Sequence, residues 1–229
     1  MLYTLEATRA NIRNRDGKRV FFLGKGDQLT WEARDFLNGE KIAILPAEQA
    51  KIERYRLLSG GFLEEKPEQM THLHGDILVL KTHPRIRFRG AMDTLEAELL
   101  LAMLEAQGQV RKQLQEVLEQ ARFLLRCEVM EEPVSDLPLC GMKPKELRER
   151  SHRPQDFYGQ PHFMPSAEDG RLLLQVNRAR CAARSAELAA MDAFLDREGN
   201  PIRSHFLQAM NRMSSMLYMI MIQLKAEKK

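Results

Sequence analysis

Residues 172–195 read as a single helix that carries charges where a core helix should be apolar. Arg180, Arg184 and Glu187 are spaced by four and three residues, so they share one helix face. That face also carries four apolar residues, Leu173, Val176, Met191 and Phe194. The flank beside it is almost all alanine, at positions 179, 182, 183, 186, 189 and 190.

Small flanking residues let a neighbouring helix approach closely, which directs the two arginines toward an interior. Unpaired buried charges are very costly, so these guanidinium groups need anions. A carboxylate elsewhere in the chain or a phosphorylated ligand would supply them. A structural ion-pair network or a solvated charged face would explain the same spacing.

The overall composition excludes several functional classes. The chain has 229 residues, a net charge of +3, and 35 basic against 32 acidic residues, so a nucleic-acid partner is not indicated. The longest apolar run, 216–222, is too short to cross a bilayer, and no membrane partner is expected. The N-terminus lacks the apolar core of a secretory signal. Three scattered cysteines are typical of reduced cytoplasmic thiols, so we expect a cytoplasmic protein with no cysteine-built metal site.

The pattern of elements predicts a mainly α protein: a four- to five-helix bundle with a small mixed α/β N-terminal appendage. We expect the appendage to cover residues 1–56, with helices at 5–12 and 31–37 and strands at 19–23 and 41–45. We expect the bundle domain to cover residues 57–229. Helices are predicted at 90–106, 110–129, 143–151, 172–195 and 202–226.

Several segments of the second domain carry candidate site residues. Residues 70–88 are predicted to form a loop followed by a strand, in which His72 and His74 make a weak metal-binding pair. Asp93 is placed in the first turn of its helix, where a carboxylate suits the helix dipole. The proline-rich stretch 130–171 has the length of a functional loop. The last helix has an apolar face and a polar face, and its five methionines between 210 and 221 suit either a core or an irregular ligand.

Three blocks together resemble the ATP:corrinoid adenosyltransferases of the ethanolamine-utilisation type. The block KTHPRIRFRGAMDTLEAEL at 81–99 is similar to the family's K-x-D-P-R segment and its following glycine and aspartate. RCAARSAE at 180–187 matches the R-x3-R-x2-E helix, and NRMSSMLYMIM at 211–221 resembles the N-R-L-S helix. SHRP at 151–154 and HFMP at 162–165 also look like this branch.

The resemblance implies transfer of the 5′-deoxyadenosyl group of ATP to the cobalt of reduced cob(I)alamin. Adenosylcobalamin forms and triphosphate leaves. ATP, Mg²⁺ and cobalamin are the ligands implied, and no side-chain nucleophile is needed, because positioning and charge stabilisation do the work. It also implies a homo-oligomer, a trimer or a dimer, a supplying reductase, a receiving cobalamin-dependent lyase, and a cytoplasmic or microcompartment setting.

The same resemblance assigns roles to individual residues. Arg180, Arg184 and Asp93 are the catalytic set, with Arg180 expected to pair with Asp93 across the contact of the first and fourth helices. His162 or Phe163 would form an apolar wall under the corrin ring, which displaces the lower axial ligand of cobalt. The ATP-binding set is Gly75, Asp76, Lys81, Arg184, Glu187 and Asn211.

The chain departs from the family pattern in three places. THLHGD at 71–76 occupies the place of the phosphate loop and keeps its glycine and aspartate but lacks the threonines that follow them, and His83 stands where an aspartate is usual. No cysteine precedes Cys127, so the family's cysteine-rich metal motif is absent and no metal ligands are predicted. The alternatives are a non-catalytic bundle that binds a corrinoid or partner proteins, and a plain structural bundle.

Overall fold

The computed structural model describes residues 1–15, 18–47 and 55–227. By its contacts the chain divides into two compact units, Met1–Lys66 and Pro67–Lys229. The division into domains between residues 56 and 57 stays a prediction. None of the helices in the described ranges has the length and apolar character that a membrane span requires.

The N-terminal unit is a small mixed structure, as the sequence predicts. Thr30 caps α2 by accepting a hydrogen bond from the backbone N–H of Ala33 at 3.3 Å, which is why this helix begins where it does. β3 pairs in parallel with β5 and antiparallel with β2. Phe21, Leu37 and Ile42 form its buried core. The elements are β1 (Leu2–Tyr3), α1 (Leu5–Ala10), β2 (Arg13–Arg15), β3 (Lys18–Leu23), β4 (Gln28–Leu29), α2 (Trp31–Gly39), β5 (Ala43–Pro46), β6 (Tyr55–Leu57) and β7 (Phe62–Leu63).

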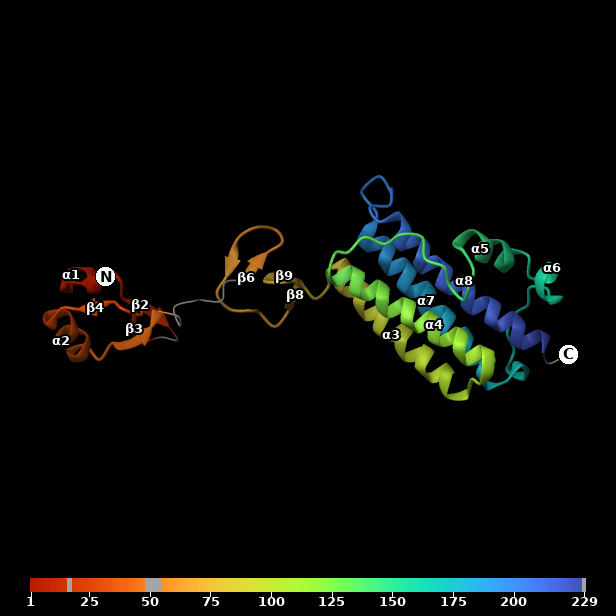
Figure 1. The fold of residues 1–229 in the computed structure, drawn as a ribbon, viewed down its shortest axis with the longest axis horizontal. Coiled ribbons are helices and arrows are strands. Elements are labelled where there is room, and N and C mark those ends of the chain that lie inside the picture. Colours follow the sequence, from red (N-terminus) through yellow and green to blue (C-terminus); the bar gives the residue numbers. More distant parts are fainter. Residues whose placement is uncertain (16–17, 48–54, 228–229) are drawn as a thin grey trace. The chain divides into compact units, whose positions relative to one another are not determined.

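The C-terminal unit is a bundle of long helices, which confirms the predicted fold class (Figure 1). α7 packs most extensively against α3 and α8, through the buried alanines predicted to allow close approach. α5 packs against α8. The elements are β8 (Met70–His74), β9 (Ile77–Leu80), α3 (Pro84–Glu105), α4 (Gly108–Val129), α5 (Pro144–His152), α6 (Pro154–Tyr158), the 3₁₀ turn η2 (Ala167–Asp169), α7 (Arg171–Phe194) and α8 (Ser204–Ala226).

The start of α3 differs from the prediction. The helix begins at Pro84, six residues before the predicted start at Gly90. The Nδ1 atom of His83 accepts a hydrogen bond from the backbone N–H of Arg85 at 3.2 Å and caps the helix. Burial, and then the charge of Arg85, lower the pKa of His83, which keeps the ring neutral and able to accept.

One smaller prediction is also corrected. Residues Met70–His74, predicted as a loop, pair antiparallel with β9 as strand β8. Gly75, with φ at +53°, makes the turn between the two strands, a conformation that glycine adopts at little cost. The five methionines of α8 are all buried in the main core, as expected of the commoner of the two interpretations.

Candidate functional site

A cavity of about 610 Å³ opens between α7, α8 and the segment that leads from α5 toward α7. Both helices contribute residues spaced by three or four positions, so one face of each is turned toward it. It is lined by Ser151, His152, His162, Phe163, Met164, Pro165, Asn177, Arg180, Cys181, Arg184, Asn211, Ser214, Ser215, Tyr218 and Met221.

Tyr218 is the centre of an aromatic stack on one wall of this cavity. Its ring lies 5.7 Å from the ring of His162 and 6.4 Å from that of Phe163, with interplanar angles of 11° and 21°. The guanidinium carbon of Arg180 lies 5.2 Å from the centroid of the same ring, within the range of a cation–π contact. The stack therefore holds an apolar aromatic surface beside the cations of α7.

His162 fixes this stack through both ring nitrogens. Nδ1 lies 2.9 Å from the Tyr218 hydroxyl, and Nε2 lies 3.2 Å from the carbonyl oxygen of His152. Because a carbonyl oxygen only accepts, Nε2 carries a proton and donates to it. Nδ1 pairs with the tyrosine hydroxyl, so the segment around His162 is tied to both α5 and α8.

Asn211 presents its amide at the cavity wall from α8. Its Nδ2 atom donates to the Oε1 atom of Glu187 at 2.7 Å. Glu187 is only 8% exposed, and a buried carboxylate needs such a donor. Its carboxylate therefore orients the Asn211 amide, while the hydroxyl of Ser214 donates to the Asn211 carbonyl oxygen at 2.9 Å.

Arg180 and Arg184 line the cavity but make no ion pair within the part of the chain that the structure describes. The ion pairs of α7 use other side chains: Arg178 with Glu98, Arg171 with Glu105 and Asp192 with Arg87. The arginine and glutamate cluster is therefore not an ion-pair network within one chain. Arg184 is exposed rather than interior, because the alanine flank, and not the arginine face, packs against the neighbouring helices.

The structure brings together most of the predicted site residues. Arg180, Arg184, Asn211, His162 and Phe163 all line the cavity. Glu187 joins them through its hydrogen bond to Asn211. Four predicted residues, Gly75, Asp76, Lys81 and Asp93, do not line it.

Lys81 and the β8–β9 turn lie at a different height from Arg184 along the axis of the bundle. Arg87 lies in the first turn of α3, and its Nη2 atom is 3.7 Å from Oδ2 of Asp192 near the end of α7. Arg184 lies eight residues before Asp192, which is about 12 Å along the helix axis. Lys81 precedes Arg87 in the chain, and its Nζ atom donates to Glu68 at 2.9 Å.

Asp93 is not where the sequence placed it. Because α3 begins at Pro84, Asp93 falls in the third turn rather than the first. It is exposed on the helix surface. The expected ion pair between Arg180 and Asp93 is not made, and Arg180 contacts Tyr218 instead.

Some cavity residues were not predicted as site residues. Tyr218 and Ser215 share the polar face of α8 with Asn211, whose role the sequence left open between solvent and a site. Asn177 and Cys181 lie on the same side of α7 as Arg184. The signal that could have found them is helical spacing: positions 211, 215 and 218, and positions 177, 181 and 184, recur every three or four residues.

The described residues contain no group of three His, Cys, Asp or Glu side chains placed to hold a metal ion. His74 instead has its Nδ1 atom 3.5 Å from the carboxylate of Glu131. No carboxylate lines the cavity between α7 and α8. The cavity walls are therefore suited to anionic and aromatic ligands rather than to a protein-bound cation.

Comparison with known proteins places this arrangement in a family. A sequence model of the family described as cobalamin adenosyltransferase matches residues 62–224, the range that contains every predicted site residue. The chain belongs to the cobalamin adenosyltransferase family. Membership confirms the resemblance drawn from the three sequence blocks.

Two relatives show how far the likeness extends. The corrinoid adenosyltransferase EutT of Salmonella typhimurium strain LT2 is 31% identical over 158 residues, or 69% of this chain and 59% of that protein. The EutT protein of Escherichia coli strain K12 is 29% identical over the same shares. The chain thus spans about three fifths of the length of the curated relatives it matches. No solved structure is significantly similar to it.

Proposed function

We propose that this chain transfers the 5′-deoxyadenosyl group of ATP to the cobalt of cob(I)alamin, in ethanolamine utilisation. The observation that carries the proposal is the convergence of Arg180, Arg184 and Asn211 beside an aromatic wall in one cavity. Family membership and the names of the EutT relatives support it.

The chemistry needs little from side chains beyond position and charge. The cobalt(I) electron pair forms a bond to C5′ of ATP, and the C5′–O bond breaks with its electron pair leaving on the triphosphate. Arginine suits this leaving group because its planar fork binds phosphate oxygens in pairs. We assign Arg184, which is free of carboxylates, to the phosphates, and Asn211, oriented by Glu187, to a hydrogen bond with ATP.

His162 and Phe163 are proposed as the apolar wall under the corrin. They form one continuous surface with Tyr218, which excludes water from the face it covers. Exclusion of a lower axial ligand by such a wall makes cobalt(II) easier to reduce. The proline-rich segment that carries them is the proposed corrin-binding lid.

Mg²⁺ is proposed to arrive with ATP rather than on the protein. Mg²⁺ prefers oxygen ligands, chiefly carboxylates, phosphates and water. The cavity has no lining carboxylate, so the protein side chains around it do not fit the ion. Only the phosphate oxygens and water would hold it there.

A homo-oligomer would explain the residues that lie outside the cavity. Gly75, Asp76 and Lys81 lie at another level of the bundle from Arg184 in the same chain, and Asp93 and Arg184 are both exposed. We propose that these residues reach the cavity of a neighbouring copy, so that the site lies between subunits. A cobalt reductase and a cobalamin-dependent lyase are the proposed partners, in the cytoplasm or beside a microcompartment.

An optical assay tests the proposal directly. ATP is added to the protein with chemically reduced cobalamin, and the cobalt(I) absorption band is followed. The band should decay with wild-type protein and persist with Arg184→Ala. Arg178→Ala is the matched control, because Arg178 is an exposed arginine of the same helix that pairs with Glu98 and should retain activity. A corrinoid spectrum that shifts on binding while the band never decays would instead indicate a non-catalytic corrinoid binder.

A further inference from the structure

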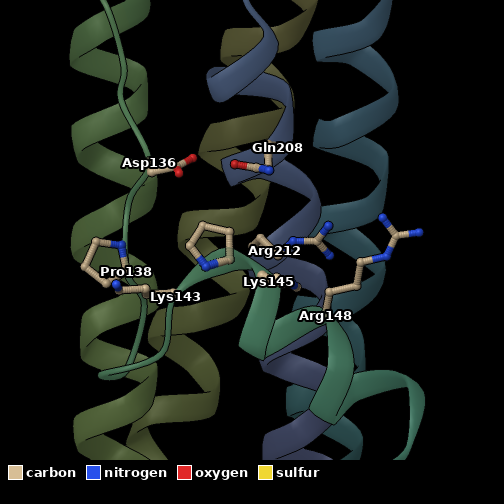
Figure 2. Close-up of a pocket in the computed structure, with 8 residues that line it drawn as sticks. Asp136, Pro138, Lys143, Lys145, Arg148, Gln208 and Arg212 are labelled. Carbon is tan, nitrogen blue, oxygen red and sulfur yellow. The ribbon is translucent and has the colours of Figure 1, made fainter.

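A second cavity, of about 560 Å³, lies between the start of α5, the first half of α8 and the segment before α5. Figure 2 shows Gln208 and Arg212 extending from α8 above the start of α5, with the Arg148 side chain rising from α5 beside them. The cavity is lined by Asp136, Pro138, Lys143, Pro144, Lys145, Arg148, Gln208 and Arg212. None of these residues lines the cavity between α7 and α8.

Arg212 is the most unusual of these residues, because it is buried and makes no ion pair with any residue that the structure describes. The residue is 9% exposed, and its Nε atom has no hydrogen-bond acceptor in the structure. The opposite charge that acts on Arg212 is that of Glu187, whose Oε1 atom already accepts from Asn211. Burial, followed by the charge of Arg148, lowers the pKa of Arg212. An arginine held this way needs an anion to compensate it.

The other cations of the cavity are also without carboxylate partners among the described residues. Lys143, Lys145 and Arg148 are exposed around the opening, and none of them has an ion pair. Asp136 is the one acidic residue of the lining, and its Oδ1 atom lies 3.1 Å from Nδ1 of His205. The lining therefore carries more positive than negative charge.

Other cations of the same segment do have acidic partners, so the lack of ion pairs is specific to the cavity lining. Arg150 pairs with Glu146 at 2.7 Å, and Arg153 pairs with Asp156 at 2.5 Å. The helix start adds to the positive field, because α5 begins at Pro144 without a side-chain cap, and N–H groups in a first helical turn have no acceptor within the helix.

We propose that this second cavity binds a small oligophosphate, a ligand that carries two or more linked phosphate groups. Four cations converging on one cavity exceed what a single carboxylate would neutralise. The volume is that of a small-molecule pocket rather than a one-ion site. The modest net charge of +3 for the whole chain does not suit a long nucleic acid.

The site is separate from the proposed adenosyl-transfer site, and the two meet at one helix. The first residues of α5 line the oligophosphate cavity, whereas Ser151 and His152 at its end line the other. A ligand at the oligophosphate cavity would therefore contact the same short helix whose His152 carbonyl oxygen anchors the ring of His162.

Calorimetric titration of the full chain with sodium tripolyphosphate at low salt tests the proposal. Arg184→Ala serves as the starting protein, because it lacks the phosphate contact proposed at the other cavity. Tripolyphosphate should still bind it, and adding Arg148→Glu should weaken that binding by about tenfold or more, since a charged contact becomes a repulsion. Adding Lys112→Glu instead, an equal charge change on an exposed lysine of α4, should leave the affinity within about twofold.

Three results would overturn the proposal: no tripolyphosphate binding to Arg184→Ala, equal loss in the Lys112→Glu and Arg148→Glu proteins, or orthophosphate binding as tightly as tripolyphosphate. Arg148 is exposed, so its substitution should leave the fold intact, which circular dichroism checks. Competition by ATP, with tripolyphosphate displaced, would identify a nucleotide as the ligand. Binding of tripolyphosphate without competition would identify a free oligophosphate.

Discussion

Two regions of the helical unit differ in whether their buried arginines form ion pairs. At the start of α3, Arg85 and Arg89 converge on Glu128 of α4, whose side chain has no exposed surface, with Nε–Oε distances of 2.5 and 2.6 Å. On α8, Arg212 is similarly buried but makes no ion pair among the described residues, and its Nε atom has no acceptor there. Burial disfavours the charged form of both Arg85 and Arg212. Hydrogen bonds to Glu131 and Glu128 nevertheless raise the pKa of Arg85, whereas burial and Arg148 lower that of Arg212.

The difference separates arginines that join elements of the fold from arginines that line cavities. The cluster around Glu128 ties α3 to the end of α4 and, through a hydrogen bond from Arg89 to the Leu73 carbonyl oxygen at 2.7 Å, to the β8–β9 hairpin. Its arginines are fully occupied. The arginines around α8, namely Arg180, Arg184, Arg148 and Arg212, line two cavities and make no ion pair among the described residues. The same residue type therefore joins elements of the fold in one region and lines cavities without an ion pair in the other.

The largest effect is expected where the structural cluster is broken. Glu128→Ala should lower the free energy of unfolding by about 3–5 kcal/mol, because it leaves two arginines buried without their carboxylate. Urea denaturation measures this loss. Glu119→Ala, on the exposed side of the same helix, is the control and should change stability by less than about 0.5 kcal/mol. A loss below 1 kcal/mol in Glu128→Ala would mean that the cluster is not what holds these elements together.

The reactivity of the cysteine thiols reports on the cavity between α7 and α8. Cys181 is exposed at the cavity between Arg180 and Arg184. Burial, with help from the charge of Glu116, raises the pKa of Cys140 to about 12, so at pH 8 only about one of its thiols in ten thousand is the reactive thiolate. Burial also raises the pKa of Cys127. A maleimide should therefore label Cys181 far faster than the other two.

The same labelling reports on the proposed nucleotide site. ATP should slow the labelling of Cys181 by covering it, and it should not change the slow labelling of Cys140. Peptide mass spectrometry at several reaction times separates the three cysteines. Labelling of Cys181 that is indifferent to saturating ATP would argue against ATP binding in this cavity.

Much of the fold follows from the sequence, because long periodic helices with clear caps are strong local signals. The predicted helices at 110–129 and 172–195 agree with α4 and α7 to within two residues. The start of α3 was missed because Gly90 reads as a helix boundary, while the cap that decides the start is a histidine ring. The short helix α6, Pro154–Tyr158, has too few residues for periodicity to show.

The candidate site could also be predicted from the sequence only in part. Helical spacing was enough to predict that Arg180, Arg184 and Asn211 lie on particular helix faces. It could not show that the Tyr218 ring contacts both Arg180 and His162, because these contacts join three distant segments. Arg212 sits among apolar residues of α8, and only the packed structure shows that its Nε atom is buried without a hydrogen-bond acceptor among the described residues.

A smaller effect is expected for the aromatic stack. Tyr218→Phe keeps the ring but removes the hydroxyl that pairs with Nδ1 of His162, which should lower the free energy of unfolding by about 1 kcal/mol. A double-mutant cycle with His162→Ala measures the coupling of this pair. Additive losses, with no coupling, would show that the hydrogen bond does not hold the segment against α8.

The smallest effect tests the comparison most directly. Arg184→Ala should change the free energy of unfolding by less than about 0.5 kcal/mol, because Arg184 is exposed and has no ion pair in the described chain. Arg89→Ala, measured in the same urea titration, should lose about 3 kcal/mol because it leaves Glu128 short of one of its buried partners. If both variants lost several kcal/mol, the arginines of α7 would also be structural. Arg184 would then stabilise the fold, and its proposed role as a phosphate ligand would lose its support.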